Sequence, residues 1–283
     1  MTTDLEKSFK AKLRNIAKEV DRNPADLWQS IVLERLLVRL GKSSYRDSFI
    51  LKGGLLLSKY LPIGRETQDL DFLGRNISNN LTELEKTFHN IARISIDDGF
   101  VFSNIKVNQL EHEHMAYSGV EVSMMASFGR SRFPVQIDVG FGDRVNPVDK
   151  SISLVNYSKG PLFEEKINLL CYPAEFIFAE KLETVVYRGG VNSRMKDFHD
   201  LYTMLNLSDL LPKPLKSVLL IVFHHRQTSL NLPLSFSDKD IVLLQAQWAR
   251  YLVRLRQKDS QILPKDISEC IAILNTKLAK ILN

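Results

Sequence analysis

The sequence contains little cysteine and no long apolar run, and both absences restrict the kinds of protein it can encode. Of its 283 residues only Cys171 and Cys270 are cysteine, and neither belongs to a Cys-x-x-Cys pair, which argues against a zinc site or a disulfide framework. No apolar stretch is long enough to span a membrane, and the opening segment MTTDLEKSFK lacks the apolar core of a signal peptide. We therefore expect a cytoplasmic protein without a membrane partner.

What remains is an ordinary globular composition with a mild excess of positive charge. Hydrophobic residues make up 44% of the chain and charged residues 25%, and the length suits one large domain or two modest ones. The formal net charge of +5 is compatible with a nucleic-acid partner, although solvated helix faces would carry the same charge.

The periodicity of apolar residues predicts a helical start, a region of strands and a helical end. Helices are expected over residues 4–18, 24–40, 55–61 and 81–99, and strands over 49–51, 100–110, 119–128, 133–141, 151–157 and 167–172. Further helices are expected over residues 174–187, 194–205, 215–225, 239–257 and 265–282. This pattern places a domain boundary between residues 172 and 173.

The most informative stretch is residues 52–72, KGGLLLSKYLPIGRETQDLDF, which ends on two closely spaced aspartates. In a strand, Asp69 and Asp71 would point to the same side, and two adjacent carboxylates repel each other unless a cation lies between them. Mg²⁺ is usually held by one or two carboxylates together with substrate phosphates. We therefore predict that both aspartates bind Mg²⁺, with Mn²⁺ as an alternative; the simpler reading is a solvated acidic turn.

A glycine pair, Gly53-Gly54, precedes these aspartates, with fourteen residues between Gly54 and Asp69. Because Gly53 and Gly54 lack side chains, their amides can approach a phosphate closely, and the helix expected after them would point its N-terminal amides at the same group. The pair therefore predicts a phosphate cradle for a nucleoside triphosphate.

Two residues between the glycines and the aspartates are candidates for contacts with that nucleotide. The planar guanidinium of Arg65 matches phosphate oxygens, although a surface arginine would look the same. Thr67 is expected on the same strand face as Asp69, which would place its hydroxyl beside the metal; the alternative is a β-branched strand residue without a role.

A third carboxylate is expected on the strand over residues 133–141, where apolar and polar residues alternate. Asp138 lies on the polar side of that strand and could complete a two-metal site or accept a proton from an attacking hydroxyl; an exposed polar position is the alternative. Asp143 follows a glycine and is interpreted as a turn residue outside the site. His112 and His114 could form a metal pair, but an exposed polar turn is the simpler interpretation.

Lys181 lies on a largely apolar helix face. No residue three or four positions away on its own helix is acidic, so its ammonium group needs another partner. A triphosphate or the acidic cluster would serve, and extension of the side chain to solvent is the alternative.

The helix expected over residues 194–205 carries three more candidates. On a helical projection Arg194 lies near the centre of the apolar stripe and Asp197 lies at its edge, so both could face a cleft. Asp200 projects to the far side, near Lys196, where it could form a surface ion pair that contributes little.

Several of these segments together resemble a known family. Gly53-Gly54 followed by Asp69-Leu70-Asp71 is similar to the first motif of DNA-polymerase-β-like nucleotidyltransferases. The segments KGG…RxTxDLDF, IDVGFGD, PAEFIFAEKLETVV and SRMKDFHDL resemble, more narrowly, the AbiEii/AbiGii toxins, which include the MenT-like toxins. The resemblance covers roughly residues 49–205.

The resemblance implies an α/β fold. A mixed-sheet nucleotidyltransferase domain with N-terminal helices would occupy residues 1–172, and a helical C-terminal bundle would occupy residues 173–283, with the nucleotide in a cleft between them.

It also implies a bacterial, cytoplasmic toxin of a type IV toxin–antitoxin (abortive infection) system with a cognate antitoxin as partner. Such an enzyme would transfer a nucleotidyl group from a nucleoside triphosphate to an acceptor hydroxyl and release pyrophosphate. In MenT-like members the acceptor is the 3′ end of tRNA, whose modification blocks translation. The alternatives are transfer to a protein or small-molecule hydroxyl, and a nucleotide- or RNA-binding module without catalysis.

The family pattern assigns roles to the candidate residues. Metal binding falls to Asp69, Asp71 and Asp138, and catalysis falls to these three with Lys181 and Asp197. Nucleotide binding falls to Gly53, Gly54, Arg65, Thr67, Lys181, Arg194 and Asp200. The chain departs from the stricter pattern at Gly54, where many nucleotidyltransferases have serine, which leaves only a backbone amide for the phosphate.

Overall fold

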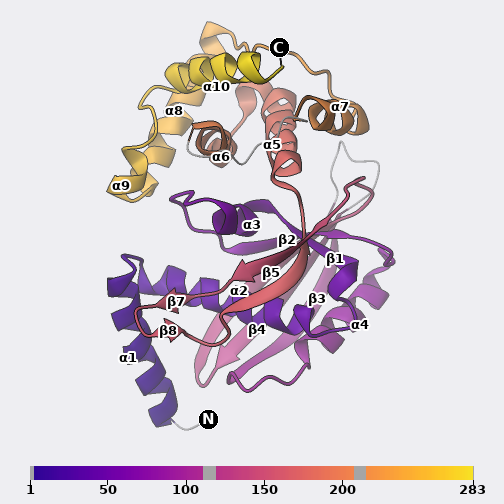
Figure 1. The fold of residues 1–283 in the computed structure, drawn as a ribbon, viewed down its shortest axis with the longest axis vertical. Coiled ribbons are helices and arrows are strands. Elements are labelled where there is room, and N and C mark those ends of the chain that lie inside the picture. The colour runs from indigo at the N-terminus through magenta and orange to yellow at the C-terminus, as the bar shows by residue number, and fades with distance from the viewer. Residues whose placement is uncertain (1–2, 111–118, 207–214, 283) are drawn as a thin grey trace. The chain divides into compact units, whose positions relative to one another are not determined.

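A computed structural model describes residues 3–110, 119–206 and 215–282 (Figure 1). The chain divides into two compact units. The sheet unit comprises Met1–Lys59 and Glu66–Tyr172, and the helical unit comprises Tyr60–Arg65 and Pro173–Asn283. The short segment Tyr60–Arg65, which the sequence pattern includes in residues 1–172, thus groups with the C-terminal helices.

The sheet unit is built on a mixed sheet of seven strands in the order β3-β4-β5-β2-β1-β9-β6. The strands are β1 Phe49–Lys52, β2 Asp69–Gly74, β3 Phe100–Leu110, β4 Gly119–Phe128, β5 Ser131–Gly140, β6 Val148–Ser153 and β9 Lys166–Cys171. Strand β2 runs parallel to β5 and antiparallel to β1, and β1 runs parallel to β9. A separate hairpin is formed by β7 Asn156–Tyr157 and β8 Gly160–Pro161. The predicted α/β class with a mixed sheet is confirmed.

Alternating apolar residues explain how the sheet buries one face. In β5, Val135, Ile137 and Val139 are all buried, and β4 buries every second residue from Val120 to Phe128. Helix α2 (Pro24–Gly41) packs against β5 and β9, and α4 (Leu81–Ala92) packs against β3. Helix α2 begins as predicted, with the Asn23 side chain accepting a hydrogen bond from the Ala25 amide.

Helix α1 (Thr3–Glu19) is attached to this core by aromatic contacts. The ring of Phe9 lies 5.3 Å from that of Trp28 and 4.6 Å from that of Phe128. In α2, Arg39 donates two hydrogen bonds to the buried carboxylate of Asp98, at 2.7 and 3.0 Å. These groups hold the helices on one face of the sheet and leave the other face for the site.

The helical unit contains α5 Ala174–Arg188, α6 Met195–Asn206, α7 Leu215–His225, α8 Asp238–Arg254, α9 Gln257–Ser260 and α10 Ile267–Leu282. Helix α5 packs against α6 and α7, and α10 packs against α6, α7 and α8. Trp248 is fully buried, donates a hydrogen bond to the Pro264 carbonyl (2.9 Å) and stacks on Tyr251. No helix in the described part of the chain is long and apolar enough to cross a membrane.

The bounds of β3, β4 and α7 agree with the sequence-based prediction, and three other elements differ from it by three residues or more. Helix α4 ends at Ala92 rather than near residue 99, with Arg93 as its C-cap. The strand expected over residues 151–157 is divided into β6 and β7, and the helix expected over 239–257 ends at Arg254, where Leu255 turns extended. His112 and His114 lie outside the described residues.

Candidate functional site

One face of the sheet carries the three carboxylates that the sequence predicts to bind metal. In β2, Leu70 and Phe72 are buried, so Asp69 and Asp71, which alternate with them, point to the opposite face. Strand β5 runs parallel beside β2 and places Asp138 directly opposite Asp71. Because opposite residues on neighbouring strands share a face, the structure brings all three together. We call Asp69, Asp71 and Asp138 the acidic row.

Two residues that the sequence pattern does not single out extend the row. Lys52 of β1 lies opposite Asp71, and Glu121 of β4 lies opposite Asp138. Glu121 accepts a hydrogen bond of 2.6 Å from Gln136 Nε2. A cation and a further carboxylate therefore flank the row on the same face of the sheet.

The carboxylate of Asp138 is in an electrostatically unfavourable position. Burial, followed by the charges of Asp71, Asp69 and Glu121, raises its pKa to about 6, although a hydrogen bond from Gln136 acts in the opposite direction. Its Oδ1 is buried and has no hydrogen-bond partner among the described residues. Buried polar atoms are almost always satisfied, so an orphaned carboxylate oxygen beside like charges indicates a place for a cation.

The donor set of the row suits a hard cation. No three His, Cys, Asp or Glu side chains within residues 3–110, 119–206 and 215–282 form a ready-made metal cage. Mg²⁺ usually takes only one or two protein carboxylates and completes its shell with water and substrate phosphates. A row of separate carboxylates, one with an unpaired oxygen, fits that kind of binding.

Gly53 is required by its contact with the row. Its φ of +70° lies in the left-handed region, and a Cβ on it would be 1.9 Å from Asp71 Oδ2. Helix α3 (Gly53–Tyr60) begins at this residue, two positions before the expected start, and Gly54 is buried in its first turn. The structure thus gives Gly53 a role in fitting Asp71, while phosphate binding by the two glycines stays a prediction.

Thr67 does not share a strand face with Asp69. Strand β2 begins at Asp69, so Thr67 precedes the strand, and its residue is only 8% exposed. The argument from strand alternation therefore does not apply to Thr67.

Asp143, which the sequence analysis interprets as a turn residue outside the site, lies in a polar cluster with Lys52 and Tyr172. Asp143 Oδ2 lies 3.4 Å from Lys52 Nζ and accepts a hydrogen bond of 3.0 Å from the Tyr172 hydroxyl. The Lys52 ammonium also lies 5.1 Å from the centre of the Tyr172 ring. A sequence pattern that identifies a turn does not show which distant residues the turn contacts, so the position of Asp143 beside Lys52 and Tyr172 could not be predicted from it.

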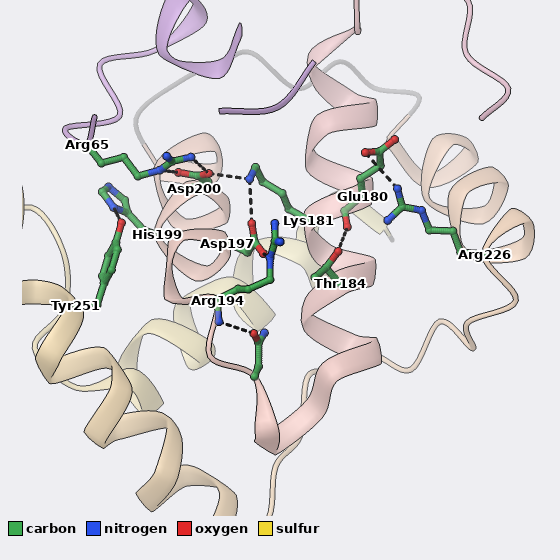
Figure 2. A network of polar contacts seen from close by, with 11 residues as sticks. Arg65, Glu180, Lys181, Thr184, Arg194, Asp197, His199, Asp200, Arg226 and Tyr251 are labelled. Atoms are coloured by element: carbon green, nitrogen blue, oxygen red, sulfur yellow. Dashed lines mark hydrogen bonds and ion pairs between the residues drawn. The ribbon is translucent and has the colours of Figure 1, made fainter. Parts of the chain in front are cut away.

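The helical unit carries the remaining candidates in one ion-pair network, formed by Arg65, Lys181, Arg194, Asp197 and Asp200 (Figure 2). The Lys181 ammonium lies 3.0 Å from Asp197 Oδ1 and 2.8 Å from Asp200 Oδ2. Arg65 donates two hydrogen bonds to Asp200, from Nε at 2.8 Å and from Nη2 at 2.6 Å. Arg194 Nε donates to Asp197 Oδ2 at 2.7 Å.

The predicted surface position of Asp200 is wrong. Asp200 is 0% exposed and pairs with Arg65 and Lys181 rather than with Lys196. The helical projection fails because α6 is covered on more than one side, by α5, α8 and α10. Segment Tyr60–Arg65 adds a guanidinium from far away in the sequence.

The partners of Lys181 also come from α6. No residue three or four positions away on its own helix is acidic, as the sequence indicates, and Asp197 and Asp200 supply two carboxylates instead. Ser193 precedes α6, where the Asn192 side chain accepts a hydrogen bond from the Arg194 amide (2.8 Å). Arg194, with 42% of its side chain exposed, is the most accessible cation of the network.

Mutual attraction keeps this network ionised despite its burial. Burial raises the pKa of Asp200, but the charges of Lys181 and Arg65 outweigh it and hold that pKa well below its usual range. Burial likewise lowers the pKa of Lys181, and the two aspartates more than reverse the effect. The adjacent His199 is different: burial lowers its pKa to about 4, so the ring is neutral at physiological pH, with Nδ1 2.7 Å from the Tyr251 hydroxyl.

Comparison with known proteins identifies the family. A family model described as the nucleotidyl transferase AbiEii toxin of type IV toxin–antitoxin systems matches residues 35–272. The chain belongs to the AbiEii family. It is therefore a nucleotidyltransferase, as the motifs predict, and the resemblance to these toxins is confirmed. The family implies a nucleoside triphosphate as substrate and an antitoxin as partner.

Solved structures agree on the fold of this AbiEii protein. It resembles MenT4, a nucleotidyltransferase toxin of Mycobacterium tuberculosis, with a TM-score of 0.57 and 16% identity over 96% of this chain and 89% of that one. It also resembles a nucleotidyltransferase structure from H. pylori, with a TM-score of 0.52 and 15% identity over 92% of this chain and 96% of that one. No curated protein matches the sequence.

Proposed function

We propose that the acidic row is the catalytic centre of a metal-dependent nucleotidyl transfer. The observation that carries this proposal is the position of Asp138, directly opposite Asp71 on a parallel strand with a buried oxygen that lacks a partner. Asp69 and Asp71 would bind the cation, which is Mg²⁺ or Mn²⁺, and Asp138 would share it. A divalent cation there would neutralise phosphate charge and favour ionisation of the acceptor hydroxyl.

The residues of the row divide the remaining work. Asp138 would accept the proton of the acceptor hydroxyl, since its Oδ1 is buried without a hydrogen-bond partner among the described residues. Gly53 lets Asp71 sit against the start of α3, where a side chain would push the carboxylate away. Gly53 and Gly54 would present amides to the triphosphate.

The ion-pair network of the helical unit would provide positive charge for the triphosphate. Its three cations exceed its two carboxylates by one charge, and Arg194 is the most exposed of them. We therefore assign phosphate contact first to Arg194, with Lys181 and Arg65 supporting it. Asp197 and Asp200 would act by holding these cations in place.

The proposed acceptor is the 3′ end of tRNA, so that the toxin would block translation. Support comes from membership of a toxin family and from a net charge of +5, which suits an RNA partner. A protein hydroxyl is the second candidate, since the same chemistry would serve it.

The test is to incubate the purified protein with total bacterial tRNA, Mg²⁺ and each α-labelled nucleoside triphosphate in turn. Asp71→Asn is the inactive variant, and Asp149→Asn is the matched control, because Asp149 lies on the same sheet in β6 with a largely exposed side chain. Label on tRNA with the wild type and with the control, but not with Asp71→Asn, supports the proposal. Label on protein alone would move the acceptor to a protein, and absence of label with either metal would reject the tRNA assignment.

A further inference from the structure

We propose that Lys52 is a positioning residue of the acidic row, whose ammonium group is the fixed counter-charge of Asp71 and is held in place by Asp143 and Tyr172. The inference rests on the proposed function, because it assumes that Asp71 binds a divalent cation. It goes beyond that function because Lys52, Asp143 and Tyr172 carry none of the roles assigned above.

The register of β1 and β2 places Lys52 beside Asp71. Lys52 is the last residue of β1 and lies directly opposite Asp71 in an antiparallel pair. Side chains in such pairs point to the same face with Cβ atoms roughly 4.5–5.5 Å apart. The lysine therefore starts beside the carboxylate that fits against Gly53.

The side chain of Lys52 extends toward Gly140 of β5. Lys52 Nζ lies 3.7 Å from the point where a Cβ on Gly140 would stand. Gly140 follows Asp138 by two residues in β5 and shares its face. The side chain thus runs from a start opposite Asp71 to an end beside Gly140, on the face of the sheet that carries the row.

Partial burial and the contact with Asp143 restrain the side chain of Lys52. The side chain of Lys52 is 15% exposed and that of Asp143 is 7% exposed, so this is not a lysine that extends freely into solvent. Tyr172 is fully buried, its amide is bonded to the Leu51 carbonyl (2.9 Å), and its hydroxyl donates to the same Asp143 oxygen that faces the ammonium. Asp143, which pairs with the ammonium group, is therefore itself held by Tyr172, a residue bonded to β1.

A purely structural ion pair is the competing explanation. Partly buried ion pairs contribute little net stability, because desolvation offsets the attraction. A fixed ammonium beside a carboxylate nevertheless competes with a divalent cation for its negative charge. If Lys52 and Asp143 set the charge balance of the row, substitution of Lys52 and substitution of Asp143 should change metal affinity in opposite directions. A purely structural ion pair does not predict opposite changes.

The experiment is isothermal titration of the full-length protein with Mn²⁺. Lys52→Met removes the competing charge and should tighten Mn²⁺ binding by roughly tenfold, as expected for one charge at this range in a partly solvated site. Asp143→Asn frees the ammonium to approach Asp71 and should weaken binding several-fold, while Lys52→Arg should stay near the wild type. Lys59→Met is the matched control, since Lys59 is 19% exposed and pairs with Glu34 away from the row, and its Mn²⁺ affinity should be unchanged.

Nucleotidyl transfer at saturating metal gives a second readout. Lys52→Met should lower kcat by about tenfold or more with little change in KM for the triphosphate, and Lys52→Arg should restore much of it, because a positioned charge acts mainly on the reacting state. Equal shifts of Mn²⁺ affinity in the same direction for Lys52→Met and Asp143→Asn, or no shift in either, would overturn the inference. If Lys52→Met does not fold, Asp143→Asn decides alone, since unchanged or tighter binding contradicts it. A wild type that neither binds Mn²⁺ nor transfers nucleotide would refute the proposed function instead.

Discussion

Replacing Asp200 with asparagine tests whether the ion-pair network supports the helical unit. Asp200 is 0% exposed and accepts hydrogen bonds from Arg65 while it pairs with Lys181. Asparagine has nearly the same shape but no charge, so the substitution leaves two buried cations with one carboxylate fewer. Removing one partner of a buried pair costs about 3–5 kcal/mol. Because Asp197 still pairs with Lys181, we expect the lower end, about 3 kcal/mol.

The two tryptophans of the chain allow this loss to be assigned to one unit. Trp28 lies in the sheet unit and Trp248 in the helical unit, where it is fully buried and stacked on Tyr251. In a Trp28→Phe background, tryptophan fluorescence during urea unfolding reports the helical unit alone. Glu269→Gln is the control, because it removes an exposed carboxylate from α10 and should change the free energy of unfolding by less than about 0.5 kcal/mol.

A double-mutant cycle makes the test sharper. If Arg65 and Asp200 act as a pair, Arg65→Met and Asp200→Asn should together cost less than the sum of their separate effects, by about 1–3 kcal/mol. Additive effects, or a cost below about 1 kcal/mol for Asp200→Asn alone, would refute the buried pairing. The original expectation of an ion pair at the surface would then be correct, since such pairs are worth about 0–1 kcal/mol.

Three further predictions concern His199, Gly53 and Arg39. Burial lowers the pKa of His199 to about 4 from an ordinary value near 6.5, so the free energy of unfolding should fall as pH decreases from about 6.5 to about 4. His199→Gln should remove about 2 kcal/mol of the decrease in that free energy between about pH 7 and about pH 5, as measured by urea unfolding. Gly53→Ala should cost at least about 1–2 kcal/mol for a left-handed alanine and should reduce nucleotidyl transfer further, because its Cβ displaces Asp71; thermal unfolding and kcat measured together check this. Arg39→Met should destabilise the sheet unit by about 3 kcal/mol, since it leaves the Asp98 carboxylate buried with reduced compensation, and urea unfolding followed by Trp28 fluorescence measures it.

Most of the fold could be predicted because its elements carry a strong periodic signal. The polar–apolar alternation of β4 and β5 defines both the strands and the face on which Asp138 lies. The same alternation in β2 places Asp69 and Asp71 together. Local sequence therefore predicted which side of each strand the carboxylates occupy, and this is most of the acidic row.

What could not be predicted depends on pairing between distant segments. The position of Lys52 opposite Asp71 follows from the antiparallel register of β1 and β2, which no local pattern specifies. Asp200 meets a guanidinium 135 residues earlier in the chain. A helical projection describes one helix and not its neighbours, so it assigns a polar residue to solvent even where other elements cover it.

The acidic row and the ion-pair network should therefore respond to mutation with opposite signs. In the network each charge has a partner, so its loss destabilises, and reduced activity of an Asp200 variant is evidence for a direct role only where unfolding shows that the helical unit remains folded. In the row, burial and then the like charges of its neighbours raise the pKa of Asp138 to about 6, so without metal the folded state loses stability as pH rises from about 4 to about 6 and stays destabilised above that. Asp138→Asn should therefore stabilise the metal-free protein at neutral pH by about 1–2 kcal/mol, after allowance for solvent screening, and should abolish transfer. Added Mg²⁺ should stabilise the wild type and not this variant in thermal unfolding. A variant that is less stable than the wild type in EDTA would show that Asp138 Oδ1 has a stabilising partner in the folded protein, and a cation would then not be needed at that oxygen.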